Sequence, residues 1–254
     1  MGQVIEYFGG RVSALSYSEK YVLYFIDNNL EVAKELSLTG VADNVKVSTT
    51  TIIRMCQKLQ LKGFSELKYV LKSIKAEKFP ADEDILDRYQ RNVISTISNI
   101  QTKDINYIAQ LMLKADKIII ISVGLSKMIG EYLSKQLMQI NKTSIYVYEW
   151  HIIELVENFA TKNDLIIFVS SSGETKTLTH IAEKLTYQNV QTVSITNTID
   201  STLNTLTTYK ICANSTKLQF AGYDVTARST LMILIDMLLE SYLVEKVKMD
   251  LTKA

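Results

Sequence analysis

The apolar residues of this chain change their spacing near Pro80, the only proline among its 254 residues. Before Pro80 they recur about every three or four positions, which is the spacing of amphipathic helices. After Pro80, short β-branched runs alternate with helical stretches, an order typical of a parallel sheet covered by helices on both faces. A proline tends to end a helix, so its place at this change predicts a domain boundary. We therefore expect an all-α domain followed by a three-layer α/β domain with a parallel sheet.

The same patterns predict the elements of each domain. Ser16 and Glu19 have the spacing of a capping box at the start of the first long helix. Strands are expected at residues 117–121, 144–148, 165–170, 192–196 and 209–213. Further helices are expected at residues 31–36, 39–45, 49–59, 65–76, 84–101, 105–114, 128–140, 152–159, 177–187 and from about 225 to 246. We place the all-α domain at residues 1–78, a helical linker at 79–104 and the α/β domain at 105–254.

The net charge of the chain is only +1, which by itself argues against a nucleic-acid partner. The charges are unevenly distributed, however. Residues 1–80 carry 11 basic and 8 acidic side chains, whereas residues 81–254 carry 17 and 19. Residues 46–78 alone hold eight basic side chains against two acidic ones. Because a local basic excess is the electrostatic signature of DNA binding, we expect the all-α domain to bind double-stranded DNA.

Several classes of protein are excluded by what the chain lacks. No apolar run approaches the roughly 20 residues of a membrane-spanning helix, and the N-terminus has no apolar segment of a secretory signal. Cys56 and Cys212 are far apart in sequence and lie in apolar segments, so we expect buried free thiols in a reducing cytosol. With His151 and His180 as the only histidines, a metal site is not expected. The chain is therefore expected to be cytoplasmic, without a membrane partner, a metal or a cofactor.

Residues 39–59 have the layout of a helix-turn-helix motif. A turn centred on Lys46 and Val47 separates two helices, and Ser48 is a good N-cap for the second. In this motif the second helix enters the major groove of DNA. Hydroxyl groups in its first turn suit phosphate contacts, and Arg54 can reach a phosphate or a guanine edge. The outward positions of this helix are Thr49, Thr50, Ile53, Arg54, Gln57 and Lys58.

Two loops of the α/β domain have the pattern of an anion-binding site. The strand at 165–170 runs into Ser170-Ser171-Ser172-Gly173-Glu174-Thr175 and then into a helix. The strand at 117–121 is followed by a loop with Gly124 and Ser126, again before a helix. A strand-to-helix turn at the carboxyl edge of a parallel sheet presents backbone N–H groups and a helix N-terminus to an anion. We expect the two loops to converge on one phosphorylated ligand.

A catalytic arrangement is not evident in the sequence. Neither a G-x-S-x-G elbow, nor a Walker lysine, nor a dinucleotide-binding fingerprint is present. Glu174 is the one carboxylate in the serine-rich loop that could act as a base, although at a helix N-terminus it also suits the dipole. His151 and His180 are the other candidates for proton transfer, and each is expected more often as a surface or packed side chain. We therefore predict a binding protein rather than an enzyme.

The combination resembles the RpiR family of bacterial transcription regulators, which join an N-terminal helix-turn-helix domain to a SIS (sugar isomerase) domain. The resemblance covers roughly residues 15–244. Residues 47–68 are similar to the family signature V-S-x-x-T-x-x-R-x-x-x-K-L-x-x-x-G-F-S-E-L, which matches at Val47, Ser48, Thr51, Arg54, Lys58, Leu59, Gly63, Phe64, Ser65, Glu66 and Leu67. The S-x-S-G-x-T phosphosugar loop matches at Ser170, Ser172, Gly173 and Thr175, and Ser126 matches the serine of the first loop.

The resemblance implies a DNA-binding regulator whose SIS domain senses a phosphorylated sugar and modulates operator binding by a homodimer or homotetramer. It implies DNA contacts from Ser48, Thr49, Thr50, Thr51, Arg54, Gln57, Lys58 and Lys62. It implies effector contacts from Gly124, Ser126, Ser170, Ser171, Ser172, Gly173, Glu174 and Thr175. The alternative is an aldose–ketose phosphosugar isomerase, in which the basic N-terminal domain would have no role.

Two positions depart from the family pattern. Lys46 stands at a turn position where the family usually has glycine, and a left-handed conformation there would cost about 1 kcal/mol. Ser122 stands where a glycine often precedes the first loop, and we expect its side chain to narrow the ligand pocket.

Overall fold

The computed structural model describes residues 2–74, 83–220 and 223–252. Pro80, at the predicted domain boundary, lies outside the described residues. The chain divides into two compact units. One comprises residues 1–82 together with 217–225, and the other comprises residues 83–216 together with 226–254. Each unit has an apolar core of its own.

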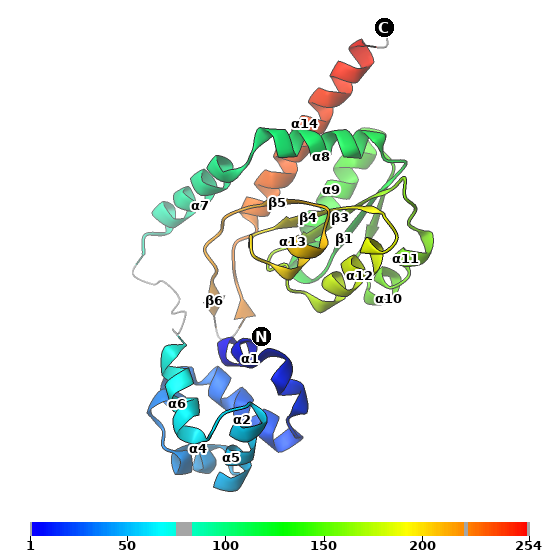
Figure 1. Cartoon of the computed structure of the whole chain (residues 1–254). Coiled ribbons are helices and arrows are strands. Elements are labelled where there is room, and N and C mark those ends of the chain that lie inside the picture. Colours follow the sequence, from blue (N-terminus) through cyan, green and yellow to red (C-terminus); the bar gives the residue numbers. More distant parts are fainter. Residues whose placement is uncertain (1, 75–82, 221–222, 253–254) are drawn as a thin grey trace. The chain divides into compact units, whose positions relative to one another are not determined.

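The first unit is a set of helices around one core (Figure 1, blue to cyan). The fully buried side chains of this core include Val22, Ile26, Ile52 and Met55. The predicted capping box is present, since both the Ser16 and the Glu19 side chains bond the backbone at the start of the second helix. The helices are α1 (Gln3–Phe8), η1 (a 3-10 helix, Gly9–Ala14), α2 (Tyr17–Asn28), α3 (Leu30–Glu35), α4 (Leu38–Val45), α5 (Thr49–Lys58) and α6 (Phe64–Ser73).

The second unit contains a five-stranded parallel sheet with the strand order β2-β1-β3-β4-β5. Since all strands run the same way, their carboxyl ends lie along one edge of the sheet. The strands follow the predicted ranges to within a residue at each end. Their bounds are β1 (Ile118–Ser122), β2 (Ser144–Val147), β3 (Leu165–Ser170), β4 (Gln191–Thr196) and β5 (Tyr209–Cys212).

Helices cover both faces of this sheet, which gives three layers (Figure 1). Alternate residues of β1 show the two faces: Ile118 and Ile120 belong to the core under α8, α9 and α14, whereas Ile119 and Ile121 belong to the core under α10 to α13. The predicted three-layer α/β architecture is confirmed. The helices are α7 (Ile85–Asn99), α8 (Thr102–Lys114), η2 (Gly124–Ser126), α9 (Lys127–Gln139), α10 (Trp150–Ile153), α11 (Val156–Phe159), α12 (Lys176–Thr186), α13 (Thr202–Leu206) and α14 (Ser229–Leu251).

The structure corrects the predicted start of the last helix. The chain first forms a two-stranded antiparallel hairpin of β6 (Gln219–Phe220) and β7 (Tyr223–Asp224), which groups with the first unit. Residues near 225 are therefore extended, because β7 pairs with β6, and α14 begins only at Ser229. The single helix predicted at 152–159 is two short helices, α10 and α11. Within the described ranges, no helix is long and apolar enough to cross a membrane.

Candidate functional site

The turn between α4 and α5 fixes the second helix of the helix-turn-helix motif. Lys46 ends α4 with φ 56° and ψ 43°, the left-handed conformation that glycine adopts more easily. The next amide, of Val47, donates to the carbonyl of Ala42 at 3.1 Å. Ser48 Oγ then accepts from the Thr51 amide at 3.2 Å and caps α5. The helices α2, α4 and α5 pack on one another, so the turn holds α5 as one member of a three-helix unit.

The outer face of α5 carries most of the side chains predicted to contact DNA. Its inner face, formed by Ile52, Met55 and Cys56, is fully buried. Ser48, Thr50, Arg54 and Gln57 are exposed, and Thr49 and Thr51 are half-buried. Lys62 is exposed in the segment between α5 and α6. The structure thus brings the predicted residues onto one helix and the segment that follows it.

Two of the basic side chains in this region bond to groups of the protein itself. Lys58 Nζ lies 2.7 Å from Glu19 Oε2, a carboxylate that is 4% exposed. Burial alone would raise the pKa of Glu19, but hydrogen bonds from Lys58 and Ser16 outweigh it and hold that pKa below its usual value. Lys68 Nζ bonds the carbonyls of Ala33, Lys34 and Leu36 at the end of α3, and burial lowers its pKa. The charge count of the sequence therefore overstates how many cations this unit presents to DNA.

The serine-rich loop joins β3 to α12 and is held by its own hydroxyl groups. Ser170 Oγ accepts from the Gly173 amide at 3.1 Å, and Ser172 Oγ accepts from the Glu174 amide at 3.2 Å. Ser170 and Ser171 are buried, whereas Ser172 is exposed and Thr175 is half-buried. The backbone turns sharply here because Gly173 has a φ of 66°. A Cβ at Gly173 would lie 2.3 Å from Ser201 Oγ, so the loop requires glycine for space as well as for conformation.

The first loop leaves the same edge of the sheet beside the serine-rich loop, because β1 and β3 are paired neighbours. It contains Gly124, with a φ of 59°, and the buried Ser126. Ser122 is fully buried at the end of β1, and its hydroxyl donates to Tyr146 Oη at 3.3 Å. It also fills the space left by Gly130, where a Cβ would lie 2.3 Å from Ser122 Oγ. The Ser122 side chain is thus engaged with β2 and α9.

Two helix N-termini therefore open at this edge. Neither α9 nor α12 has a side chain hydrogen-bonded at its N-cap. The Lys127 amide at the start of α9 donates to the Gly124 carbonyl of the preceding helix η2. Free amides and the positive end of a helix dipole attract an anion, and a phosphate is the ligand that this geometry suits best. The hydroxyl groups of Ser126, Ser172 and Thr175 lie in or next to the same two junctions. We call the Gly124–Ser126 and Ser170–Thr175 segments together the phosphate cradle.

The residues considered as catalytic bases have other roles in the structure. Glu174 accepts from the Thr202 amide and from Thr202 Oγ1, both at 2.7 Å, and so its carboxylate caps α13. His151 and His180 are exposed surface side chains beside Glu149 and Glu154. In the described part of the chain, no cluster of histidine, cysteine and carboxylate groups could hold a metal ion.

Asn197, which was not predicted from the sequence as a site residue, follows β4 at the same edge of the sheet. Its amide donates to the Ser171 carbonyl at 3.0 Å, and its Nδ2 donates to Ser171 Oγ at 3.2 Å. It also bonds the start of the last helix. Its Nδ2 donates to the Ala227 carbonyl, and its Oδ1 accepts from Thr230 Oγ1. The sequence could have indicated Asn197, because it directly follows a buried strand. Since β3 and β4 end side by side, the residue after β4 lies near the loop after β3.

Comparison with known proteins identifies a known domain in each of the two units. The model of the rpiR-family helix-turn-helix domain matches residues 2–78. The model of the SIS domain matches residues 111–241, which is more than half of the chain. The fold and the cradle thus define a SIS-domain protein with an N-terminal helix-turn-helix.

Several known proteins share this organisation. The transcriptional regulator GlvR of Bacillus subtilis is 28% identical over 220 residues, which cover 84% of each chain. The structure of the Vibrio vulnificus NanR protein complexed with ManNAc-6P has a TM-score of 0.61 and 26% identity, and it covers 97% of this chain and 93% of that one. The sugar isomerase domain of an RpiR transcription factor from Sphaerobacter thermophilus, at 16% identity and a TM-score of 0.57, shares the fold over 66% of this chain and 93% of that one. The chain belongs to the RpiR family of helix-turn-helix transcriptional regulators with a SIS domain.

Proposed function

We propose that this regulator binds an operator in double-stranded DNA and that a phosphorylated sugar in the SIS domain changes its affinity for that operator. One observation carries the proposal. The same chain presents a capped, outward-facing helix on a basic unit and a phosphate cradle in which the one carboxylate, Glu174, is used as a cap. An anion site without a free base suits a sensor better than an enzyme.

The DNA contacts are assigned to α5 and the segment after it. Arg54 and Gln57 extend from the exposed face and suit base edges, whereas the hydroxyls of the first turn suit phosphates. Lys58 would have to leave Glu19 to reach DNA. The proposed contacts are Ser48, Thr49, Thr50, Thr51, Arg54, Gln57, Lys58 and Lys62.

The effector contacts are assigned to the phosphate cradle. The uncapped N-termini of α9 and α12 would hold the phosphate, with the serine and threonine hydroxyls as additional donors. NanR, which shares the fold over nearly the whole chain, was solved with ManNAc-6P, a phosphorylated sugar. The proposed contacts are Gly124, Ser126, Ser170, Ser171, Ser172, Gly173, Glu174 and Thr175.

DNA as the partner supports a proposal for the assembly and the compartment. A two-fold dimer would read two half-sites about 34 Å apart or a multiple of that distance. We propose a cytoplasmic homodimer or homotetramer, because one recognition helix reads only one half-site.

The decisive experiment separates DNA binding from sugar-phosphate binding by means of two variants. Arg54→Ala should weaken binding to DNA from upstream of the protein's own gene at least about fivefold, because one good base contact is worth about 1–3 kcal/mol. It should leave sugar-phosphate binding unchanged. Ser172→Ala should weaken sugar-phosphate binding about tenfold and leave DNA binding in the absence of sugar unchanged, since a hydrogen bond to a charged group contributes about 1.5–3 kcal/mol.

Electrophoretic mobility shift and calorimetry measure the two affinities. Lys20→Ala is the control for charge, because it removes a cation from α2 and not from α5, and Thr205→Ala is the control for a surface hydroxyl. If Arg54→Ala binds DNA as the unchanged protein does, α5 is not the recognition helix. If Ser172→Ala keeps full sugar-phosphate affinity, the cradle is not the effector site.

The isomerase alternative makes the opposite prediction for the same protein. A coupled assay with hexose and pentose phosphates should show no turnover, because Glu174 caps α13 and the two histidines lie on the surface. Turnover that is lost in Glu174→Gln would favour the enzyme instead.

A further inference from the structure

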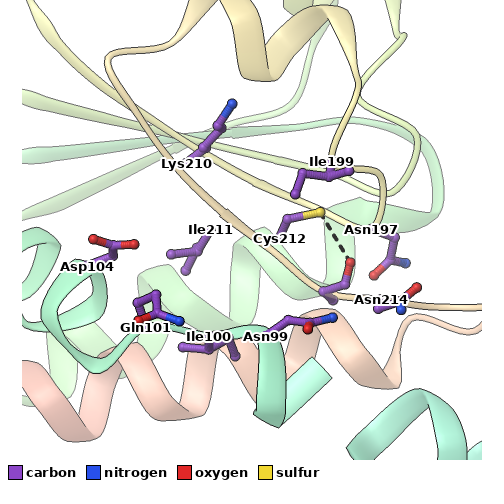
Figure 2. A pocket seen from close by; sticks show the side chains of 11 residues that line it. Asn99, Ile100, Gln101, Asp104, Asn197, Ile199, Lys210, Ile211, Cys212 and Asn214 are labelled. Atoms are coloured by element: carbon purple, nitrogen blue, oxygen red, sulfur yellow. Dashed lines mark hydrogen bonds between the residues drawn. The ribbon is translucent and has the colours of Figure 1, made fainter. Parts of the chain in front are cut away.

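A cavity of about 520 Å³ lies beside the edge strand β5, at the carboxyl side of the sheet. Figure 2 shows residues 99–101, at the junction of α7 and α8, on one side and Ile199 and Cys212 on the other. This volume falls in the range of about 300–1,000 Å³ that small-molecule sites occupy. All of its lining residues belong to the second unit. The proposed contacts of the phosphate cradle do not include any of them.

The lining of this cavity combines carboxamides with an apolar wall. A carboxamide both donates and accepts hydrogen bonds, as a sugar hydroxyl does, so the two groups match in either direction. The branched side chains of Ile100, Ile199 and Ile211 offer a surface to the C–H face of a ring. The carboxamides in the lining are Asn99, Gln101, Asn197 and Asn214. Those of Asn99 and Asn214 already donate to Ser95, and that of Asn197 bonds Ser171 and Thr230.

The charges around the cavity cancel. Asp104 and Lys210 are its only ionised lining residues, and they form no ion pair with each other or with any other described residue. The Gln101 side chain likewise has no hydrogen bond within the described residues. Gln101 and Asp104 are exposed and free to bond a ligand, whereas the Lys210 amine points away from them (Figure 2). A lining of zero net charge does not favour an anion, which distinguishes this cavity from the phosphate cradle.

Asn197 connects the cavity to the cradle. It forms part of the cavity wall, and its amide and Nδ2 groups bond the Ser171 carbonyl and hydroxyl. The cradle follows β3 and the cavity follows β5, two strands away, which corresponds to about 10 Å at the usual strand spacing. A hydroxylated molecule in the cavity would therefore lie next to a phosphate in the cradle.

We propose that this cavity binds the uncharged, hydroxyl-bearing body of a sugar, with Gln101 and Asp104 as its polar contacts. The inference rests on the proposed function in taking a sugar as the ligand class. Two sources have this chemistry: the body of the molecule whose phosphate lies in the cradle, or a second, unphosphorylated sugar. The experiment below distinguishes them.

The Cys212 thiol supplies a local readout of occupancy. It is half-buried in the cavity wall, whereas Cys56, the other cysteine, is fully buried in the core of the first unit. We would measure the rate of Cys212 alkylation by iodoacetamide, using mass spectrometry of the Cys212 peptide. The probes are the 6-phosphates of glucose, fructose, N-acetylglucosamine and N-acetylmannosamine, each beside its free sugar, and inorganic phosphate. A probe present at ten times its dissociation constant should slow alkylation about tenfold if it covers the thiol.

Gln101→Trp tests the cavity without disturbing the core, because Gln101 is exposed and its side chain caps nothing. The indole should occupy the cavity, abolish the protection of Cys212 and weaken sugar binding at least about tenfold. Lys103→Trp is the matched control, since Lys103 is exposed on the same turn of α8 and does not line the cavity. It should behave as the unchanged protein does.

Each outcome decides a different point. Protection by a sugar phosphate but not by its free sugar, lost in Ser172→Ala, identifies the cavity as the place of the effector's body. Protection by a free sugar that persists in Ser172→Ala identifies a second sugar site, and it supports the cavity even if the cradle binds nothing. Sugar-phosphate binding that depends on Ser172 but leaves Cys212 unprotected overturns the cavity proposal while the proposed function stands. An absence of protection by every probe also overturns it.

Discussion

At the scale of single residues, the DNA-binding unit depends on one buried carboxylate. Glu19 closes the capping box of α2 through the Ser16 amide at 2.7 Å and also accepts from Lys58 Nζ on α5. The same side chain therefore caps one helix and fixes the end of another. The capping role was predictable from the spacing of Ser16 and Glu19, since it depends on two residues only three positions apart. The ion pair was not, because it joins residues 39 positions apart.

The lowered pKa of Glu19 predicts how this unit responds to acid. Its contribution should be complete above the ordinary glutamate pKa of about 4.3 and should be lost as the pH falls through the lower pKa of the folded state. Glu19→Gln should cost about 1–3 kcal/mol at pH 7 and remove this part of the acid sensitivity. Hydrogen exchange of α2 and α5 at pH 7 and pH 3 measures both effects.

Glu31→Gln is the control for that measurement, because Glu31 pairs with Lys34 while 59% of its side chain is exposed. Exposed ion pairs contribute little, so its effect should stay below about 1 kcal/mol. Equal effects of the two substitutions would show that Glu19 is not a special position.

At the scale of elements, the turn between α4 and α5 stores strain that the sequence predicted. Lys46 has the left-handed conformation expected for a family glycine position. Lys46→Gly should stabilise the α4–α5 pair by up to about 1 kcal/mol, because glycine adopts the left-handed conformation without strain. The larger conformational entropy of glycine in the unfolded state reduces this gain. Lys46→Ala removes the same charge but keeps the strain, and it should not stabilise.

Hydrogen exchange of peptides from residues 38–58 is the suitable measurement for these variants. The only tryptophan, Trp150, lies in the second unit, so its fluorescence does not report on α4 and α5. If both variants have the same stability, the charge of Lys46 and not its backbone conformation determines the outcome.

At the scale of the whole molecule, the chain passes between the two units three times. It does so after residue 82 and on both sides of the β6–β7 hairpin, after residues 216 and 225. Both stems of the hairpin are anchored in the second unit. Asn92 and Thr96 of α7 bond Thr216 and Asn214, whereas Asn197 bonds Ala227 and thereby joins the second stem to the cradle. Covalent connections therefore run from the proposed effector site to residues that group with the DNA-binding unit.

This arrangement predicts a reciprocal coupling between operator and effector. If a saturating sugar phosphate changes operator affinity by some factor, operator DNA must change sugar-phosphate affinity by the same factor, typically about 5- to 150-fold. Calorimetry of the sugar phosphate with and without operator, and DNA titrations with and without sugar phosphate, give the two ratios. Ser172→Ala should abolish the effect of sugar on DNA binding at concentrations that saturate the unchanged protein. Operator affinity that is the same with and without a bound sugar phosphate would contradict the sensor function.

The sequence by itself determined the parts of this protein that depend on short stretches of chain. Runs such as 118–121 and 165–169 are apolar at every position, so they indicated buried parallel strands, and the spacing of residues 41–59 indicated the helix-turn-helix. The loops of the cradle were recognisable because glycine and serine follow those strands directly. These patterns follow from local backbone preferences and from the burial of neighbouring apolar side chains.

Only the tertiary structure decided how the polar groups pair. Glu174 caps α13, Lys68 bonds the end of α3, and Asn197 links the cradle to α14. These bonds join residues 26 to 35 positions apart. The antiparallel hairpin before α14 likewise depends on pairing and not on periodicity. Such hydrogen bonds form only after the helices and the sheet have packed, so nothing in a short window of sequence marks them.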